Sequence, residues 1–363
     1  MKTIAVIGTH GKTSILYILE LIFCASNKNI GVIGDFGVRI NKNKLGGRYE
    51  RIHDAIKEME TNNIEYLFIE LHEENDGLEA IHFDCIVFSD YNEWDYTEER
   101  STLFRQSIEK AKNIIINSDS ELCLRVLKGI TDLYTITYGL NHKSTVTAST
   151  ISIVQDRMEY NYYLQRGIAS HEGNEIMVQE LPVEINFVGY QNIYNTLASI
   201  TTALLYDLEM EKVINALKNS SQIPNRLELI KCDGISILID MARDSYSFKM
   251  LFETIQYLFY KKAFIAISIE NLRVLLKSTT IDDFIEDFSL IQGAHISVIG
   301  EFKEKIVDKD SRKLLVEAVV KNKLNFDHFI DPESYFDKYL PKLSKDDLLV
   351  WIGNRMVIEP YLK

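Results

Sequence analysis

The chain has 363 residues, of which 46% are hydrophobic and 26% are charged, and its formal net charge is −13 at pH 7. This is the composition of a globular protein that is long enough for two or three domains. The negative charge argues against a general nucleic-acid binder or a protein of anionic membranes, although it allows a local basic pocket for a nucleotide. The four cysteines are scattered, and neither a signal peptide nor an apolar span of about 20 residues is present, so we expect a cytoplasmic protein.

The N-terminal stretch combines a strand, a glycine-rich turn and a helix. Residues 4–7 are apolar and favour a buried parallel strand, and the apolar density of residues 15–22 favours a buried helix. The turn between them consists of Gly8, Thr9, His10, Gly11, Lys12, Thr13 and Ser14. Such a turn binds phosphate, because its backbone N–H groups and the helix N-terminus both favour an anion. Lys12 would then reach the outer phosphates, and Thr13 would offer a hydroxyl to Mg²⁺.

The turn departs from the strict phosphate-loop pattern G-x-x-x-x-G-K-[ST], since Val6 stands five residues before Gly11. An ordinary strand-to-helix turn with an exposed lysine is therefore the alternative. We expect a phosphate-binding loop, because the turn directly follows a predicted strand near the N-terminus.

Strands and helices alternate in the residues that follow. We predict strands at 29–34, 65–71, 83–89 and 113–117, and helices near 51–62 and 99–111. The alternation indicates a mainly parallel sheet, which binds ligands beyond the carboxyl ends of its strands. At that edge Glu70 would share a face with His72 if the strand continues, and Asp90 begins a second acidic loop. Glu70 and Asp90 are candidate Mg²⁺ ligands, with a solvated acidic loop as the alternative.

In the second half of the chain, the pattern of predicted strands and helices changes twice. Residues 145–187 predict antiparallel strands, and helices near 192–206 and 210–220 follow. After a junction at 222–226 the alternation restarts, without a dinucleotide fingerprint. We predict strands at 235–240, 263–268, 295–300, 326–330 and 348–352, and a helix near 246–260. The expected fold is α/β: a P-loop domain (1–225) with a doubly wound, mainly parallel sheet and a β-rich insertion, then a smaller Rossmann-like domain (226–363).

Several motifs, taken in order, resemble the Mur ligases, the ATP-dependent amide-forming enzymes of peptidoglycan assembly. The turn Gly-Thr-His-Gly-Lys-Thr, the strand that ends at Glu70, and Gly189 through Asn195 with Ala198 behind it carry the resemblance. It covers residues 1 to about 245, and the remainder fits in architecture only. We expect no room for the N-terminal UDP-binding domain of the muramyl-peptide ligases, a feature in which the chain is similar to folylpolyglutamate synthases.

The resemblance implies ATP and Mg²⁺ as cofactors and assigns roles to particular residues. Asn192 would contact adenine, because an amide donates and accepts hydrogen bonds at once, although it could also cap a helix; Asn195 belongs to the same motif. Arg226 would meet the γ-phosphate, and Asp240 would bind ribose. The implied nucleotide site therefore consists of Gly8, Thr9, His10, Gly11, Lys12, Thr13, Ser14, Asn192, Asn195, Arg226 and Asp240. Lys12, Glu70 and Arg226 would be catalytic, and Thr13, Glu70 and Asp90 would hold the metal.

Several positions depart from the family pattern. Trp94 stands where the family has a metal-binding histidine, and Asp35 stands where threonine is usual. Arg100 aligns with a lysine that the family carbamoylates to bind a second Mg²⁺, and arginine would not readily form a carbamate. Arg243 replaces a histidine after Asp240. Nearby carboxylates, including those of Glu93 and Asp95, could serve the metal instead.

The implied function is amide formation. ATP would activate a small-molecule carboxylate as an acyl phosphate, which an amino acid or another amine would attack, with no nucleic acid or membrane as partner. The departures leave an alternative, a catalytically degenerate nucleotide-binding subunit or regulatory protein that has a protein partner.

Overall fold

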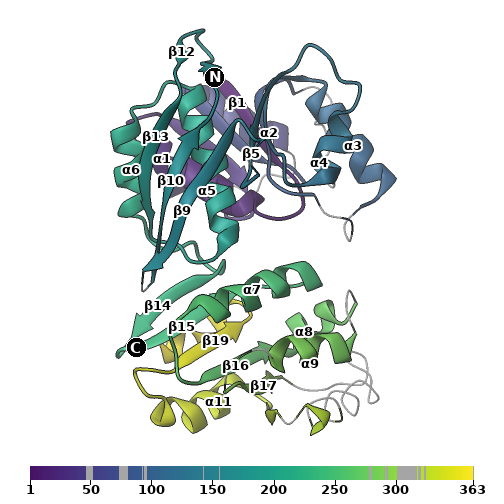
Figure 1. The fold of residues 1–363 in the computed structure, drawn as a ribbon, viewed down its shortest axis with the longest axis vertical. Helices are drawn as coiled ribbons and strands as arrows, with labels where there is room; N and C mark the ends of the chain where they lie inside the picture. The colour runs from purple at the N-terminus through teal and green to yellow at the C-terminus, as the bar shows by residue number, and fades with distance from the viewer. Residues whose placement is uncertain are drawn as a thin grey trace. The chain divides into compact units, whose positions relative to one another are not determined.

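The computed structural model describes residues 1–45, 52–72, 81–91, 93, 96–141, 143–154, 156–277, 280–289, 291, 293–300, 317, 320–322 and 324–362. Trp94 and Asp95 lie outside these residues. The chain forms two compact units, drawn in Figure 1. The first unit comprises Met1–Ser152, Met158–Asn186 and Gln191–Ser220, and the second comprises Ile153–Arg157, Phe187–Tyr190 and Ser221–Lys363.

Among the described residues, eleven strands form one sheet in the first unit, in the order β13-β10-β9-β8-β7-β6-β1-β5-β2-β3-β4. The strands are β1 (Lys2–Ile7), β2 (Ile30–Gly34), β3 (Gly37–Ile40), β4 (Asn43–Lys44), β5 (Tyr66–Glu70), β6 (Phe83–Phe88), β7 (Ala111–Asn117), β8 (Tyr134–Tyr138), β9 (Val146–Val154), β10 (Arg157–Leu164) and β13 (Gln179–Ile185). The first strand is central and parallel to both neighbours, with Val6 opposite Glu70 on β5 and Val87 on β6. The predicted parallel sheet is confirmed.

The β-rich segment continues this sheet. Strand β8 pairs with β9 in parallel through Tyr138 and Val146, and β10 pairs with β13 antiparallel, with Tyr160 opposite Val183. Strand β9 (Val146–Val154) is the first strand of the segment 145–187, which was predicted to form antiparallel strands. Strands β11 (Ile168–Ala169) and β12 (Glu175–Ile176) make a small sheet of their own.

Helices cover the large sheet because the inner strands are apolar on both faces. They are α1 (Lys12–Ala25), α2 (Ile52–Thr61), α3 (Glu98–Ile108), α4 (Glu121–Leu127), α5 (Tyr190–Leu205) and α6 (Met210–Lys218). Helix α1 packs against α6 and β5. Its Phe23 ring lies edge-on to Phe68 with centroids 4.8 Å apart, a contact that adds roughly 0.5–1.5 kcal/mol to the burial of the two rings. This packing fixes the direction in which α1 leaves the turn at residues 8–11.

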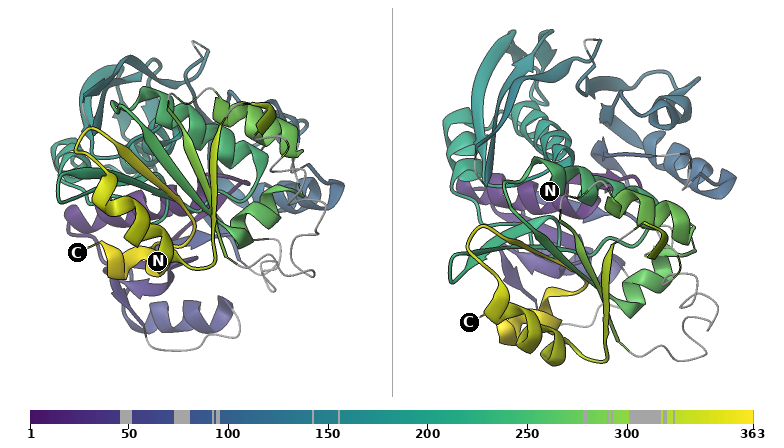
Figure 2. Two further views of the ribbon diagram at one scale, coloured as in Figure 1. Left: turned by 90° about the horizontal axis from the view of Figure 1, so that it is seen from below. Right: turned by 60° about the horizontal axis from the view of Figure 1, so that its bottom comes forward.

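The second unit is built on a six-stranded sheet in the order β14-β15-β19-β16-β17-β18 within the described residues. The strands are β14 (Glu228–Cys232), β15 (Ile235–Asp240), β16 (Ala263–Ser268), β17 (His295–Ile299), β18 (Asn325–Phe329) and β19 (Leu348–Ile352). The edge strand β14 is antiparallel and the remaining pairs are parallel. The strands fan out across one another, as twisted sheets do (Figure 2). The predicted Rossmann-like architecture is confirmed.

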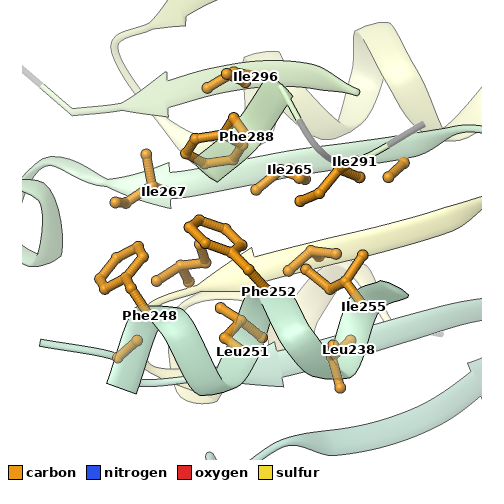
Figure 3. Packing of buried hydrophobic residues seen from close by; sticks show 14 of the residues in the cluster. Leu238, Phe248, Leu251, Phe252, Ile255, Ile265, Ile267, Phe288, Ile291 and Ile296 are labelled. Carbon is orange, nitrogen blue, oxygen red and sulfur yellow. The ribbon is translucent and has the colours of Figure 1, made fainter. Parts of the chain in front are cut away.

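The helices of this unit are α7 (Ser245–Tyr257), α8 (Ile269–Leu275), α9 (Ile281–Ser289), α11 (Pro332–Tyr339) and α12 (Arg355–Ile358). Phe252 of α7 and Phe288 of α9 pack over Ile265 of β16 in the core shown in Figure 3. None of the helices in the described part of either unit is long and apolar enough to cross a bilayer.

Candidate nucleotide and metal site

The turn between β1 and α1 is shaped by two glycines. Gly8 has φ 128° and Gly11 has φ 81°, backbone conformations that favour glycine. A Cβ on Gly8 would lie 2.4 Å from Ser89 Oγ and 2.6 Å from the carbonyl oxygen of Asp90. A Cβ on Gly11 would lie 2.6 Å from Asn195 Oδ1. Neither position has room for a side chain, so the loop lies tight against the loop after β6 and against α5.

Hydrogen bonds hold the turn against the loop after β6. The Thr9 N–H donates to the Asp90 carbonyl over 2.8 Å. The Ser89 hydroxyl lies 2.6 Å from the His10 carbonyl oxygen and 3.0 Å from that of Ile7. Ser89 was not among the predicted site residues, although its place directly after a buried strand could have indicated it.

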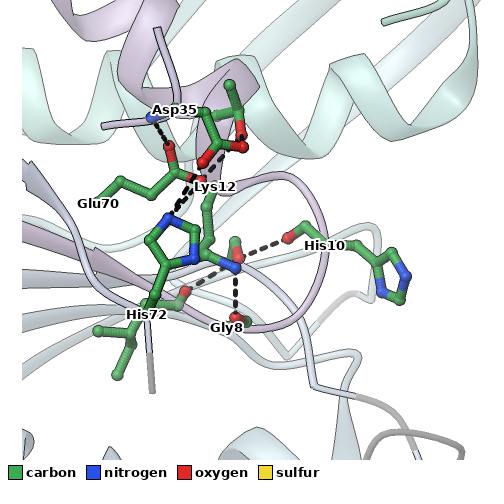
Figure 4. A network of polar contacts seen from close by, with 9 residues as sticks. Gly8, His10, Lys12, Asp35, Glu70 and His72 are labelled. Carbon is green, nitrogen blue, oxygen red and sulfur yellow. Dashed lines mark hydrogen bonds and ion pairs between the residues drawn. The ribbon is translucent and has the colours of Figure 1, made fainter. Parts of the chain in front are cut away.

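The start of α1 presents donors of the kind that bind an anion. Its N-cap residue is Gly11, and no side chain caps it. The first backbone N–H groups of a helix have no intrahelical acceptor, and they carry the positive end of its dipole. The Lys12 ammonium lies over the same turn, where Nζ donates to the Gly8 carbonyl over 2.9 Å (Figure 4). The turn therefore carries backbone N–H donors and an ammonium group close together, a combination that suits an anion.

Acidic and imidazole groups gather beside this turn. Thr13 Oγ1 donates to Glu70 Oε1 over 2.8 Å and lies 3.3 Å from Asp35 Oδ2. His72 Nε2 lies 3.3 Å from Asp35 Oδ1 and 3.7 Å from Glu70 Oε1 (Figure 4). Within the described part of the chain, Asp35, Glu70 and His72 form a group that could hold a metal ion. One ligand atom from each residue lies within 4.8 Å of those of the other two.

Two of the three predicted metal residues, Thr13 and Glu70, are therefore in contact, and the third, Asp90, is outside this group. Asp90 is buried after β6, where its Oδ1 accepts from the Tyr91 N–H over 2.9 Å. The sequence did not single out Asp35 as a ligand. For His72 a signal was present in the sequence, because side chains alternate along a strand and a strand that continues past Glu70 places His72 on the same face.

Helix α5 forms a wall of the turn through Asn192 and Asn195, which are 3% and 2% exposed. Asn195 Nδ2 donates to Asn192 Oδ1 over 3.0 Å. Asn192 is the third residue of α5, which begins at Tyr190, so the alternative that it caps the helix is wrong. Since Asn195 Oδ1 lies 2.6 Å from the position of a Cβ on Gly11, this pair lies directly against the turn.

Arg226 and Asp240 belong to the second unit. Asp240 ends β15, and its Oδ2 accepts from the Leu227 N–H over 2.7 Å. Burial raises the pKa of the Asp240 carboxyl to about 6, against the opposing effects of the Leu227 N–H and the Arg226 guanidinium. Asn225, with φ 58°, accepts from the Arg355 N–H over 2.6 Å through Oδ1. The segment that carries Arg226 is thus bound to the end of β15 and to α12.

Two named ligases are similar to this chain in amino-acid sequence. The UDP-N-acetylmuramoyl-L-alanyl-D-glutamate--L-lysine ligase of Staphylococcus epidermidis is 25% identical over 299 residues, which are 77% of this chain and 58% of that protein. A UDP-N-acetylmuramoyl-L-alanyl-D-glutamate--2,6-diaminopimelate ligase of Clostridium acetobutylicum is 26% identical over 247 residues, 63% of this chain and 48% of that protein. The chain therefore spans about half of the length of these relatives.

Solved structures share the fold. MurF from Acinetobacter baumannii superposes with a TM-score of 0.73 at 11% identity, covering 100% of this chain and 76% of that one. Folylpolyglutamate synthase from Thermotoga maritima superposes with a TM-score of 0.70 at 13% identity, covering 99% of this chain and 88% of that one. The sequence profile of the Mur ligase middle domain matches residues 6–203, which include the turn, Glu70 and the asparagines of α5. With more than half of its residues in that match, the chain belongs to the Mur ligase family.

Proposed function

We propose that this protein is an ATP-dependent ligase that joins a carboxylate to an amine. In the first step a carboxylate oxygen of the substrate attacks the γ-phosphorus of ATP, and ADP leaves. In the second step the amine attacks the carbonyl carbon of the acyl phosphate, loses a proton and forms the amide while phosphate leaves. The observation that carries the proposal is the contact between Thr13 of the glycine turn and Glu70, in a chain of this family.

The residues of the turn fit the phosphates of ATP. The uncapped start of α1 offers backbone N–H groups to a phosphate oxygen. Lys12 would neutralise the outer phosphates, while Thr9, His10 and Ser14 would complete the turn around them. Charge neutralisation and positioning are the main contributions that a protein makes to phosphoryl transfer.

The donors beside the turn fit Mg²⁺, because the Thr13 hydroxyl and the Glu70 carboxylate are hard oxygen ligands. The ion would supply further neutralisation of phosphate charge. Asp90 is proposed as an additional oxygen ligand, although its carboxylate is outside the group around Glu70.

Three further contacts follow from the family resemblance. Asn192 would recognise adenine with Asn195 supporting it, Asp240 would accept from a ribose hydroxyl, and Arg226 would meet the γ-phosphate. The asparagines and Asp240 are buried and hydrogen-bonded, so their side-chain orientations are defined before any ligand binds.

The proposed substrates are a small-molecule carboxylate and an amino acid or another amine. The curated relatives are named for adding L-lysine or 2,6-diaminopimelate to a UDP-linked muramoyl dipeptide. We extend only the class of reaction to this chain.

An isotope experiment tests the acyl phosphate. Substrate carboxylate labelled with ¹⁸O should transfer one ¹⁸O atom to inorganic phosphate, in step with ADP release that requires both carboxylate and amine. Mass spectrometry of the phosphate, run with pools of amino acids and acyl acceptors, measures this. Lys12→Ala should abolish the transfer, while Lys128→Ala, which changes an exposed lysine, should leave it unchanged.

A catalytically degenerate nucleotide-binding protein remains the second candidate function because of Arg100. This residue lies in the first turn of α3, and arginine does not readily form the carbamate that the family uses. If the wild-type protein binds ATP yet releases no ADP with any pool of amino acids and acyl acceptors, the ligase proposal fails. The function as a degenerate nucleotide-binding protein would then replace it.

A further inference from the structure

Asp35 and His72 lie beside the turn and have no role in the proposed ligase reaction. Asp35 begins the turn between β2 and β3, and His72 follows β5 by two residues. Asp35 approaches Thr13 and His72 approaches Glu70, and Thr13 and Glu70 are the proposed ligands of the metal (Figure 4).

The spacing of the four donors matches that of ligands around one ion. Adjacent ligands of an octahedral ion with bonds of roughly 2.1 Å lie about 3 Å apart. Thr13 Oγ1 is 2.8 Å from Glu70 Oε1 and 3.3 Å from Asp35 Oδ2. His72 Nε2 is 3.3 Å from Asp35 Oδ1 and 3.7 Å from Glu70 Oε1.

The backbone around Gly34 holds this arrangement in place. The Asp35 N–H donates to Glu70 Oε2 over 3.3 Å, which positions the turn over the carboxylate. A Cβ on Gly34 would lie 2.9 Å from the same Glu70 Oε2 and 2.5 Å from Leu16 Cδ2, so the close approach depends on glycine. The carboxylate of Glu70 is therefore fixed from two directions before an ion arrives.

The site is closed on one side and open on the other. The side chain of Glu70 is 1% exposed, whereas those of Asp35 and His72 are 47% and 40% exposed. An ion can enter from solvent past Asp35 and His72, and its remaining positions can be filled by water or by a phosphate oxygen.

The imidazole changes which ion the site prefers. Oxygen ligands suit both Mg²⁺ and Mn²⁺, but Mg²⁺ is a hard ion that is bound through oxygen, and first-row transition ions accept nitrogen readily. We infer that Asp35, Glu70 and His72, together with Thr13, form one divalent-cation site that binds Mn²⁺ in preference to Mg²⁺ and does so without nucleotide. The inference rests on the proposed function, since the same ion would neutralise the phosphates of ATP.

Metal binding by the nucleotide-free protein tests the inference. Calorimetry should find one Mn²⁺ per chain, bound at least about tenfold more tightly than Mg²⁺. His72→Gln keeps the size and polarity of the side chain but removes the nitrogen donor, so Mn²⁺ affinity should fall by about tenfold or more while Mg²⁺ affinity changes little. His171→Gln is the matched control, because His171 lies outside this group, and it should bind as the wild type does.

A spectroscopic readout reports on the bond itself. Electron spin-echo modulation of bound Mn²⁺ should show coupling to a ¹⁴N nucleus in the wild type and in His171→Gln, and the coupling should be absent in His72→Gln. If His72→Gln does not fold, Asp35→Asn provides the second test, and it should weaken Mn²⁺ and Mg²⁺ to similar extents.

Equal Mn²⁺ affinity in wild type and His72→Gln, or no Mn²⁺ binding without nucleotide, would overturn the inference. These results are independent of the ligase proposal. A protein that releases ADP with Mg²⁺ and shows no preference for Mn²⁺ refutes only the metal preference. A protein that prefers Mn²⁺ through His72 but never releases ADP supports the metal site and refutes the ligase.

Discussion

The hydroxyl of Thr13 donates to Glu70 Oε1 over 2.8 Å, which joins the first turn of α1 to the carboxyl end of β5. These two residues come from neighbouring strand–helix elements of a parallel sheet, where strand ends meet at one edge. Lys12 precedes Thr13, and its ammonium group donates to the Gly8 carbonyl of the same turn.

Replacement of Lys12 by alanine should weaken ATP binding. A charge-assisted contact to phosphate contributes about one to a few kcal/mol, so the dissociation constant should rise by about 10- to 100-fold. Isothermal titration calorimetry measures the change, with Lys128→Ala as the exposed control. Equal ATP affinity in Lys12→Ala and wild type would show that the turn is not a phosphate-binding loop.

Replacement of Gly8 by alanine should destabilise the first unit. The new Cβ would meet Ser89 Oγ at 2.4 Å and the Asp90 carbonyl oxygen at 2.6 Å, in a backbone with φ 128°. We expect a loss of about 2 kcal/mol or more in the free energy of unfolding. Urea denaturation measures it.

Gly173→Ala is the matched control for that prediction. Gly173 also has a positive φ, 88°, but no atom lies within 4 Å of its ideal Cβ. Gly173→Ala should lower the free energy of unfolding only through backbone strain, by about 1 kcal/mol. If the two variants are equally stable, the close approach at Gly8 is not a constraint on the fold.

Replacement of Arg226 by alanine should separate binding from turnover. A contact with the γ-phosphate stabilises charge that develops during transfer more than it stabilises ADP. We expect nearly unchanged ADP affinity and a decrease of about 100-fold or more in substrate-dependent ATP turnover. Steady-state kinetics with ADP calorimetry measures both, and Arg273→Ala, an exposed arginine on α8, is the control. A parallel loss of ADP affinity would assign Arg226 to ground-state binding instead.

Asp240 should give the stability a particular dependence on pH. Its pKa is raised from the ordinary value of 3.8 to about 6, so between these values the folded state holds more protons than the unfolded state. Stability contributed by this group is therefore greatest below about pH 4 and is lost as pH rises towards 6, by at most about 3 kcal/mol. The difference between wild type and Asp240→Asn in denaturation experiments from pH 4 to 7 isolates the effect. A difference that does not vary with pH would contradict the raised pKa.

The sequence by itself determined the elements whose signals are local. The apolar run at residues 4–7, the glycines of the turn and the apolar helix behind them predicted β1, the loop and α1, because strand, turn and helix preferences act between near neighbours. Strands 235–240, 263–268 and 348–352 were predicted at their observed bounds for the same reason. Their continuous apolar character reflects burial on both faces.

Among the strands that the sequence analysis missed, β8 and β14 were missed for identifiable reasons. Strand β8 reads Tyr-Thr-Ile-Thr-Tyr and is partly exposed, with 39% of Tyr134 accessible, so its hydrophobic signal is weak. Strand β14 carries the charged Lys231, which weakens its hydrophobic signal. The turn that follows it consists of Asp233 and Gly234, with φ 50° and 85°, and an Asp-Gly turn between apolar runs could have predicted the hairpin with β15.

Only the tertiary structure decided which side chains meet. Asp35 and His72 belong to different loops, and their approach to Thr13 follows from the order β1-β5-β2 in the sheet. The insertion of the late strand β19 between β15 and β16 is of the same kind. Sequence patterns report the burial of each element, whereas strand order and the contacts at strand ends depend on packing between residues far apart in the chain. For that reason the grouping of Asp35 and His72 with Glu70 beside the turn emerged only from the fold.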